Sequence, residues 1–187
     1  MGYFDTEEGV NQYFEMAKGH DGRDLIEKLP EYLPAGSSVL ELGMGPGSDL
    51  ELLSKHYRVT GSDSSRLFVD RYQKMNAAAD VVVLDAVSHD IERSLDCLFS
   101  NKDLHHLQRE DLERSVPSQA EIRHDEGVLS HSFWPGDKFE SISGLHFQFY
   151  LETGLEEIFK SHFDVVLMER YEEMEPGDSI FLVARKR

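Results

Sequence analysis

Apolar residues recur along the chain with two spacings, and these spacings predict the order of its elements. Short apolar runs predict buried strands, and segments in which apolar residues return every three or four positions predict amphipathic helices. The predicted strands cover residues 39–42, 58–63, 80–86, 95–100, 127–133, 163–168 and 179–184. Helical segments separate most of the first five strands, an order that is typical of a parallel sheet covered by helices.

The last two predicted strands differ from the others, because only a turn containing Pro176 and Gly177 separates them. A parallel connection needs a crossover of about a dozen residues or more, so the final strand should return antiparallel. We therefore expect an α/β fold with a doubly wound, seven-stranded, mostly parallel sheet, helices on both faces and an antiparallel last strand. Residues 80–86 are nearly all apolar and are predicted to form a central strand.

Two helical segments precede the first strand. Val10, Tyr13, Phe14 and Ala17 recur at helical spacing, and a second apolar face follows the glycines at positions 19 and 22. We expect residues 1–36 to form a helical leader beside a core of residues 37–187, within a single domain of 187 residues. Further along, Pro117 is predicted to end a helix that begins at residue 108, with another turn of helix through Ala120 and Ile122 as an open alternative.

The first strand leads into a loop with three glycines. Glycines at positions 43, 45 and 47 remove side chains, so backbone amides and the next helix N-terminus can approach a ligand closely. The spacing departs from the dinucleotide-binding fingerprint at Ser48, and the lysine of a Walker loop is missing. Glu41 stands just before the loop, where a carboxylate repels a pyrophosphate and attracts an ammonium or sulfonium group. The loop therefore suits a cationic ligand.

An acidic residue stands at or near the end of each of the first three predicted strands, at Glu41, Asp63 and Asp85. The carboxyl ends of parallel strands meet at one edge of a sheet, and packing alone does not require acids there. One strand–helix–strand unit separates Glu41 from Asp63, a spacing that places Asp63 where a ribose would lie. An Asp63 that only caps the following helix is the alternative interpretation.

The run Glu41-Leu42-Gly43-Met44-Gly45-Pro46-Gly47 resembles the first motif of the class I S-adenosylmethionine-dependent methyltransferases. The resemblance extends over residues 39–187 and implies methyl transfer from S-adenosylmethionine, with S-adenosylhomocysteine as product. It implies that Glu41 and the loop hold the methionine part, that Asp63 holds the ribose, and that Asp85 and the Ala86 amide hold the adenine.

In this family a leader often covers the cofactor, so the resemblance also makes Tyr13 and His20 candidate contacts. Each has a simpler alternative, Tyr13 in a helix interface and His20 in a solvated turn. The residues predicted to bind the cofactor are Tyr13, His20, Glu41, Gly43, Met44, Gly45, Gly47, Asp49, Asp63, Ser64, Asp85, Ala86, Ser100 and Asn101.

His105 and His106 follow the fourth strand by about one turn, where one of them could orient or deprotonate a nucleophile. A pair of histidines at an ordinary helix start is the alternative. Metal binding by the pair is not expected, because adjacent side chains diverge on a helix and no third ligand is evident. The aromatic segment 133–150 is expected to be a loop, either an acceptor pocket or the seam of an insertion packed on the core.

The net charge and the cysteine content limit the kinds of partner and the compartment that we expect for this protein. The formal charge of −17 disfavours nucleic acid, and the only basic run is Arg185–Arg187 at the end of the chain. Cys97 is the only cysteine, which excludes an internal disulfide and favours a reducing cytoplasm. The sequence shows neither a signal peptide nor an apolar run long enough for a membrane span. We expect a cytoplasmic enzyme, and the oligomeric state stays open.

The expected activity is methyl transfer to a nucleophile of a small molecule, with a protein acceptor as the other possibility. Two other functions fit the same pattern. An aminopropyl transferase would need an acidic channel for a polyamine, and the stretch after Phe99 lacks an obvious acidic pair. A non-catalytic adenosyl-binding sensor or partner subunit would keep the loop and the strand-end acids without turning over an acceptor.

Overall fold

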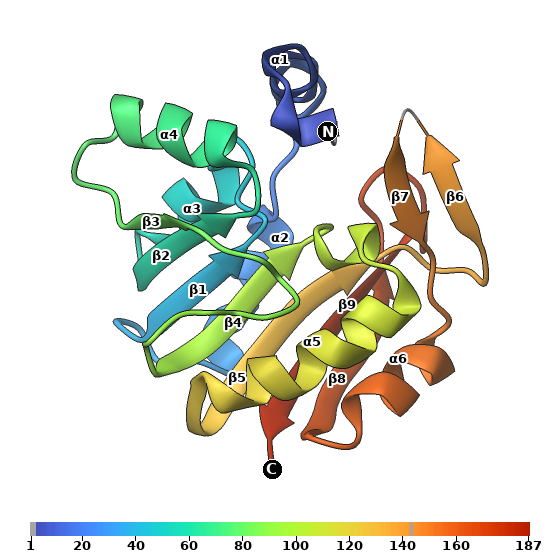
Figure 1. Ribbon diagram of the computed structural model, residues 1–187. Helices are drawn as coiled ribbons and strands as arrows, with labels where there is room; N and C mark the ends of the chain where they lie inside the picture. Colours follow the sequence, from blue (N-terminus) through green and yellow to red (C-terminus); the bar gives the residue numbers. More distant parts are fainter. Residues whose placement is uncertain (1–2, 143) are drawn as a thin grey trace.

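The computed structural model describes residues 3–142 and 144–187, and side chains except those of residues 123 and 125. Seven strands form one sheet in the order β3-β2-β1-β4-β5-β9-β8 (Figure 1). The strands are β1 Ser38–Leu42, β2 Arg58–Asp63, β3 Val81–Val83, β4 Leu95–Asn101, β5 Arg123–Phe133, β8 Phe163–Tyr171 and β9 Ser179–Lys186. The first five run parallel, and β9 is antiparallel to both β5 and β8. The predicted fold class is confirmed.

Alternate residues of each central strand enter cores on opposite faces of the sheet, as the two-residue period of a strand requires. Leu40 of β1 faces one core, which α5 (Arg109–Glu121) and α6 (Glu152–Phe159) cover. Its neighbour Val39 faces the other, which α2 (Arg23–Ile26), the short helix η2 (Leu29–Glu31) and the end of α3 (Ser48–Leu53) cover. Both residues are fully buried. Helices therefore cover both faces of the sheet.

The third strand differs from its prediction. β3 lies at the edge of the sheet and pairs only with β2, and its Val83 is 40 % exposed. It spans Val81–Val83, so Asp85 lies in the turn beyond it and not at a strand tip. The run of apolar residues indicated a strand correctly, but a single strand cannot reveal how many neighbours it has.

Two helical predictions also need correction. α5 continues through Pro117, because Val116 and Ala120 on either side of the proline are buried against the core, and this packing offsets one lost backbone hydrogen bond. The second leader helix is two short pieces, α2 and η2. The first leader helix, α1 (Glu7–Met16), begins as predicted, with the Thr6 side chain accepting a hydrogen bond from the Gly9 amide.

The aromatic segment forms a β-hairpin in place of the expected loop. Strands β6 (Phe139–Ile142) and β7 (Leu145–Gln148) pair antiparallel outside the main sheet. In Figure 1 this hairpin and α1 both rise above the rim at which β1 and β4 end. The leader is anchored there by the Ser65 hydroxyl, which donates to the Phe4 carbonyl at 2.6 Å. Within the described part of the chain, no helix has the length and apolar character of a membrane span.

Candidate functional site

The glycine loop adopts conformations that other residues rarely take. Gly43, Gly45 and Gly47 have φ values of 68°, 47° and 88°. A Cβ on Gly43 would lie 2.0 Å from the Asp103 carboxyl group, and one on Gly47 would lie 2.2 Å from the Tyr72 ring. These glycines are therefore required both by the backbone conformation and by close neighbours.

Four carboxylates gather around this loop. Asp63 accepts from the Gly45 amide at 3.0 Å and from the Ser65 amide at 2.8 Å. Burial, together with the nearby Asp103, raises the pKa of Asp63 to about 7 despite these bonds. Burial raises the pKa of Asp103 to about 6. The two acids thus share a partly protonated site that would ionise if a ligand brought donors or positive charge.

The other two carboxylates lie on the opposite side of the loop. Glu41 is 3 % exposed, and no donor among the described residues contacts its Oε2 atom. Burial and the neighbouring acids Asp49, Asp63 and Asp103 raise its pKa well above the usual range. Asp49 is also buried, and desolvation raises its pKa although the Gly22 amide and the Asn101 amide group donate to it. A buried, unpaired acid is costly, so this site favours a cation.

The turn after β3 forms the far end of the site. Asp85 is exposed, and its Oδ1 atom accepts from the Val87 amide at 2.6 Å. The Ala86 carbonyl accepts a hydrogen bond of 2.6 Å from the Ser115 hydroxyl of α5. A hydrogen bond from α5 therefore anchors this turn.

These residues line two adjoining clefts at the rim of the sheet. The first, of about 360 Å³, includes Leu84, Asp63, Ser64, Asp85 and Ala86. The second, of about 350 Å³, lies toward Glu41, Asp49 and the aromatic hairpin. Both clefts are lined by Tyr13, Gly43, Gly45, Asn101, Lys102 and His106. The two spaces therefore meet at the glycine loop.

His106 lies at this junction with a defined tautomer. Its Nδ1 atom is 2.8 Å from the carbonyl oxygen of His146, which can only accept, so Nδ1 carries the hydrogen and Nε2 keeps a lone pair. Burial lowers the pKa of His106. The bond joins the short helix η3 (Leu104–His106) to β7 of the hairpin. A neutral imidazole with a free Nε2 lone pair can accept a proton.

His105 is more deeply buried, at 2 % exposure. Its ring stacks on Trp134 with centroids 4.4 Å apart, and burial lowers its pKa well below the usual range. Among the described residues neither ring nitrogen has a hydrogen-bond partner. Its side chain lines the second cleft, but both ring nitrogens are buried and do not face that space. No group of three possible metal ligands occurs in residues 3–142 and 144–187.

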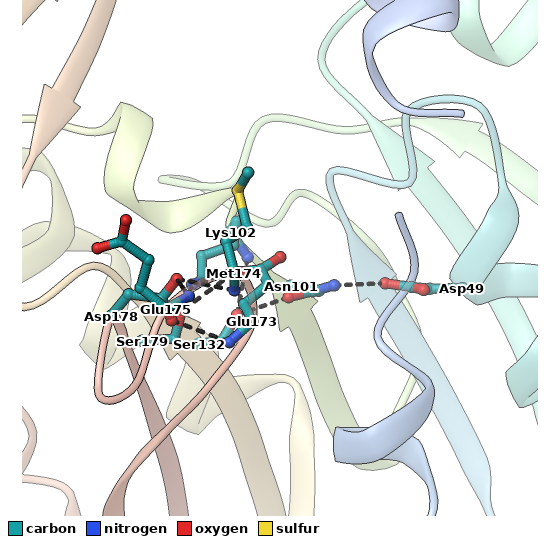
Figure 2. Close-up of polar contacts among 9 residues, drawn as sticks. All are labelled: Asp49, Asn101, Lys102, Ser132, Glu173, Met174, Glu175, Asp178 and Ser179. Atoms are coloured by element: carbon teal, nitrogen blue, oxygen red, sulfur yellow. Dashed lines mark hydrogen bonds and ion pairs between the residues drawn. The ribbon is translucent and has the colours of Figure 1, made fainter. Parts of the chain in front are cut away.

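A polar network that the sequence did not predict supports the second cleft (Figure 2). The Asn101 amide donates to Asp49, while its oxygen accepts from the Ser132 hydroxyl at 2.7 Å. Ser132 in turn accepts from the amide of Lys102, a residue with φ of 56°. The Lys102 ammonium group donates to Glu173 at 2.8 Å and to Ser179 at 2.6 Å.

The loop between β8 and β9 is folded onto this network. The Asp178 carboxylate accepts three backbone hydrogen bonds of 2.9 Å, from the amides of residues 173, 174 and 175. These bonds lower the pKa of Asp178 to about 2. The acidic residues of this hairpin turn are visible in the sequence, but nothing in their spacing shows that the turn folds back over the end of β4.

Most of the predicted site residues line the two clefts, and two do not. Those that do are Tyr13, His20, Glu41, Gly43, Met44, Gly45, Asp49, Asp63, Ser64, Asp85, Ala86, Asn101, His105 and His106. Gly47 packs against Tyr72 and precedes α3. Ser100 is fully buried and its hydroxyl lies 2.9 Å from His131 Nδ1, so its side chain cannot contact a ligand in either cleft. Three further residues with charged side chains line the clefts but were not predicted from the sequence: Lys102, Asp103 and Glu173.

The aromatic segment divides between its two predicted roles. Trp134, Leu145 and Phe147 line the second cleft. Tyr150 is 2 % exposed and packs edge-on against Phe133 in the core. The same segment therefore contributes both a cleft wall and a seam on the core.

A family model described as "Methyltransferase domain" matches residues 39–127, which run from β1 into β5 and include all four clustered carboxylates. This part of the chain is therefore similar to a methyltransferase domain. A curated relative, the trans-aconitate 2-methyltransferase of Paracidovorax citrulli, is 35 % identical over 75 residues. That match covers 38 % of this chain and 28 % of the relative, so the chain aligns with about a quarter of that protein's length.

Solved methyltransferase structures share the fold at low sequence identity. A TehB-like S-adenosylmethionine-dependent methyltransferase from Corynebacterium glutamicum has a TM-score of 0.78 and 17 % identity, covering 97 % of this chain and 100 % of its own. The 1,6-didemethyltoxoflavin-N1-methyltransferase of Burkholderia thailandensis, with S-adenosylhomocysteine bound, has a TM-score of 0.74 and 21 % identity, covering 96 % and 88 %. The family match ends before the hairpin and the loop between β8 and β9, which contribute Leu145, Phe147, Glu173, Met174 and Asp178 to the second cleft.

Proposed function

We propose that this chain is an S-adenosylmethionine-dependent methyltransferase, which binds S-adenosylmethionine across the two clefts and transfers its methyl group to a small molecule. The observation that carries the proposal is Glu41, a buried carboxylate whose Oε2 atom has no donor among the described residues, beside the glycine loop. A ligand that brings an ammonium or sulfonium group would stabilise the ionised form of this acid. The solved relative with S-adenosylhomocysteine bound supports this choice of ligand.

The residues present fit the donor from end to end. Glu41, Asp49 and the loop amides would hold the amino-acid part, because they offer acceptors and backbone donors within one cleft. Asp63 would accept from the ribose hydroxyls, and the turn at Asp85 and Ala86 would hold the adenine. Tyr13, which lines both clefts, would cover the donor from the leader side.

The donor, when bound, supplies a methyl group that is already activated by its positive sulfur. The chain therefore needs mainly to hold two partners in line and to exclude water, and such positioning contributes about 7–11 kcal/mol at best. Tyr13 of the leader lines both clefts, and Leu145 and Phe147 of the hairpin line the second. His106 Nε2 would accept a proton from the acceptor there, and the His105 ring would form part of the wall beside it.

Calorimetric titration with S-adenosylmethionine and S-adenosylhomocysteine tests the cofactor. We expect both to bind at the glycine loop, and absence of binding by either would contradict the proposal. Transfer of labelled methyl to members of a metabolite panel then tests catalysis. Binding without transfer to any acceptor would favour a non-catalytic sensor, and transfer of an aminopropyl group from decarboxylated S-adenosylmethionine would favour an aminopropyl transferase.

We also infer a cytoplasmic, small-molecule enzyme. The names of two relatives support a small acceptor, since one names trans-aconitate and the other a didemethyltoxoflavin. The high negative charge opposes nucleic acid as a partner. Fractionation of cells that produce the chain, with enzymatic assay of each fraction, tests the location.

A further inference from the structure

The part of the second cleft beyond the glycine loop is built from apolar and aromatic side chains. Trp134 and Phe147 have ring centroids 5.5 Å apart with planes inclined by 21°, and both line the cleft together with Leu145. Met16 and Met174 stand at its margin, 66 % and 75 % exposed. This wall suits a ligand with an apolar or aromatic body.

The charges of the same cleft are strongly unbalanced. Its described lining contains the carboxylates of Asp21, Glu41, Asp49, Glu173 and Asp178, and the ammonium group of Lys102. If Glu41 and Asp49 serve the donor, the lining still contains the carboxylates of Asp21, Glu173 and Asp178 against the single ammonium group of Lys102. An anionic ligand entering this space would be repelled, and a cation would be attracted.

The one lysine is not available to a carboxylate ligand. Its ammonium group is held by Glu173 and Ser179 and lies 5.9 Å and 5.3 Å from the ring centroids of Trp134 and Tyr171. The side chain is 11 % exposed. Binding a carboxylate at Lys102 would require breaking this ion pair and leaving Glu173 unpaired.

Two imidazole side chains, those of His105 and His106, also line this space. His106 offers the Nε2 lone pair described above. His105, 2 % exposed, has no hydrogen-bond partner at either ring nitrogen among the described residues. Of the two, the Nε2 atom of His106 can accept a hydrogen bond or a proton from a donor such as an amine.

We propose that the acceptor is an amine with an apolar or aromatic body, and that the cleft discriminates against carboxylate acceptors; this rests on the proposed methyl transfer. The ammonium form enters beside Glu173 and gives one proton to His106 Nε2. The freed nitrogen lone pair then forms a bond to the donor methyl carbon, while the carbon–sulfur bond breaks and its electron pair stays on sulfur. The products are a methylated ammonium compound and the neutral thioether.

Matched ligands that differ in charge test the proposal. Tryptamine is compared with indoleacetate, and phenethylamine with hydrocinnamate, by titration into the full chain saturated with S-adenosylhomocysteine; trans-aconitate serves as a polycarboxylate. We expect the amine of at least one pair to bind about tenfold or more tighter than its carboxylate partner, which corresponds to about 1.4 kcal/mol. Labelled methyl transfer to the same compounds gives a second readout.

The variant Glu173→Gln should reduce this preference at least about threefold, because it removes a carboxylate and releases the charge of Lys102. Glu175→Gln is the matched control, since Glu175 belongs to the same turn but does not line the cleft. The proposal is overturned if each carboxylate binds as well as its amine, if no amine binds, or if trans-aconitate is the better substrate. Failure of S-adenosylhomocysteine to bind would instead contradict the proposed function, so the two failures are distinguishable.

Discussion

The Nε2 atom of His131 lies 3.1 Å from the amide oxygen of Gln119, with both side chains fully buried. The Gln119 amide nitrogen donates to Ser115 at 2.9 Å, so its oxygen faces the imidazole and Nε2 carries the hydrogen. Nδ1 of His131 then accepts from the Ser100 hydroxyl. Since Ser115 donates to the Ala86 carbonyl, one directed chain of hydrogen bonds runs from β4 to the turn proposed to hold the adenine.

This series of hydrogen bonds predicts that a substitution at Gln119 changes the affinity for the cofactor. Gln119→Ala should leave the His131 Nε2 hydrogen unpaired and lower the free energy of unfolding by about 1–3 kcal/mol. It should also weaken S-adenosylhomocysteine binding by up to about tenfold, because Ser115 loses the partner that fixes its hydroxyl. Urea denaturation and calorimetry measure the two effects. Ser118→Ala, one residue away, is the control, and equal behaviour of the two variants would contradict the positioning role.

A second prediction concerns the crowding of the glycine loop. Gly43 and Gly36 have similar φ values of 68° and 80°, but a Cβ on Gly43 would lie 2.0 Å from Asp103 whereas one on Gly36 would meet nothing within 4 Å. Replacing Gly36 with Ala should cost about 1 kcal/mol from backbone strain alone. Gly43→Ala adds a collision with a buried carboxyl group, so we expect a larger loss of stability and loss of S-adenosylhomocysteine binding. Similar melting temperatures and affinities for both variants would show that the contact is unimportant.

The sequence sufficed for the glycine loop and the strand-end acids because these features depend on local order. Gly43 follows a strand directly, and parallel strands must end at one rim, so Glu41 and Asp63 could be placed together from their spacing alone. The fold class followed from the same alternation of strands and helices. The match to a methyltransferase domain covers this same segment, with the glycine loop, Glu41 and Asp63.

The remaining features depend on contacts that are distant in the sequence. Lys102 meets Glu173 from another hairpin, and no spacing rule connects them. The edge position of β3 depends on its neighbours in the sheet, and the course of α5 through Pro117 depends on burial that its own residues do not reveal. The sequence showed that segment 133–150 is rich in aromatic residues. Only the structure shows that Trp134 lines the cleft while Tyr150 packs in the core.

A third prediction follows from the raised pKa of Asp63, about 7 in the folded chain against 3.8 for the free group. Between these values the folded state binds a proton that the unfolded state has lost, so Asp63 lowers the free energy of unfolding as pH rises from about 4 to about 7. His105 and His106, whose pKa values are lowered, act in the opposite direction below about pH 6.5.

A comparison with Asp63→Asn isolates the contribution of Asp63. The stability of the variant relative to the natural chain should increase by up to about 4 kcal/mol as pH rises from about 4 to about 7. Urea denaturation at several pH values without ligand measures this difference. A difference that stays constant over the whole range would mean that Asp63 ionises normally.

The last prediction joins the buried acids to ligand binding. At about pH 6 a group with a pKa of about 7 is mostly protonated, and Asp103, with a pKa of about 6, is about half protonated. If S-adenosylhomocysteine places its ammonium group near Glu41 and its ribose hydroxyls on Asp63, the ionised forms become favoured and protons leave on binding. Calorimetry in buffers with different ionisation enthalpies should therefore show net proton release at about pH 6. The release should become smaller in Asp63→Asn, while uptake of protons, or heats that are independent of the buffer, would contradict the proposed contact between these acids and the ligand.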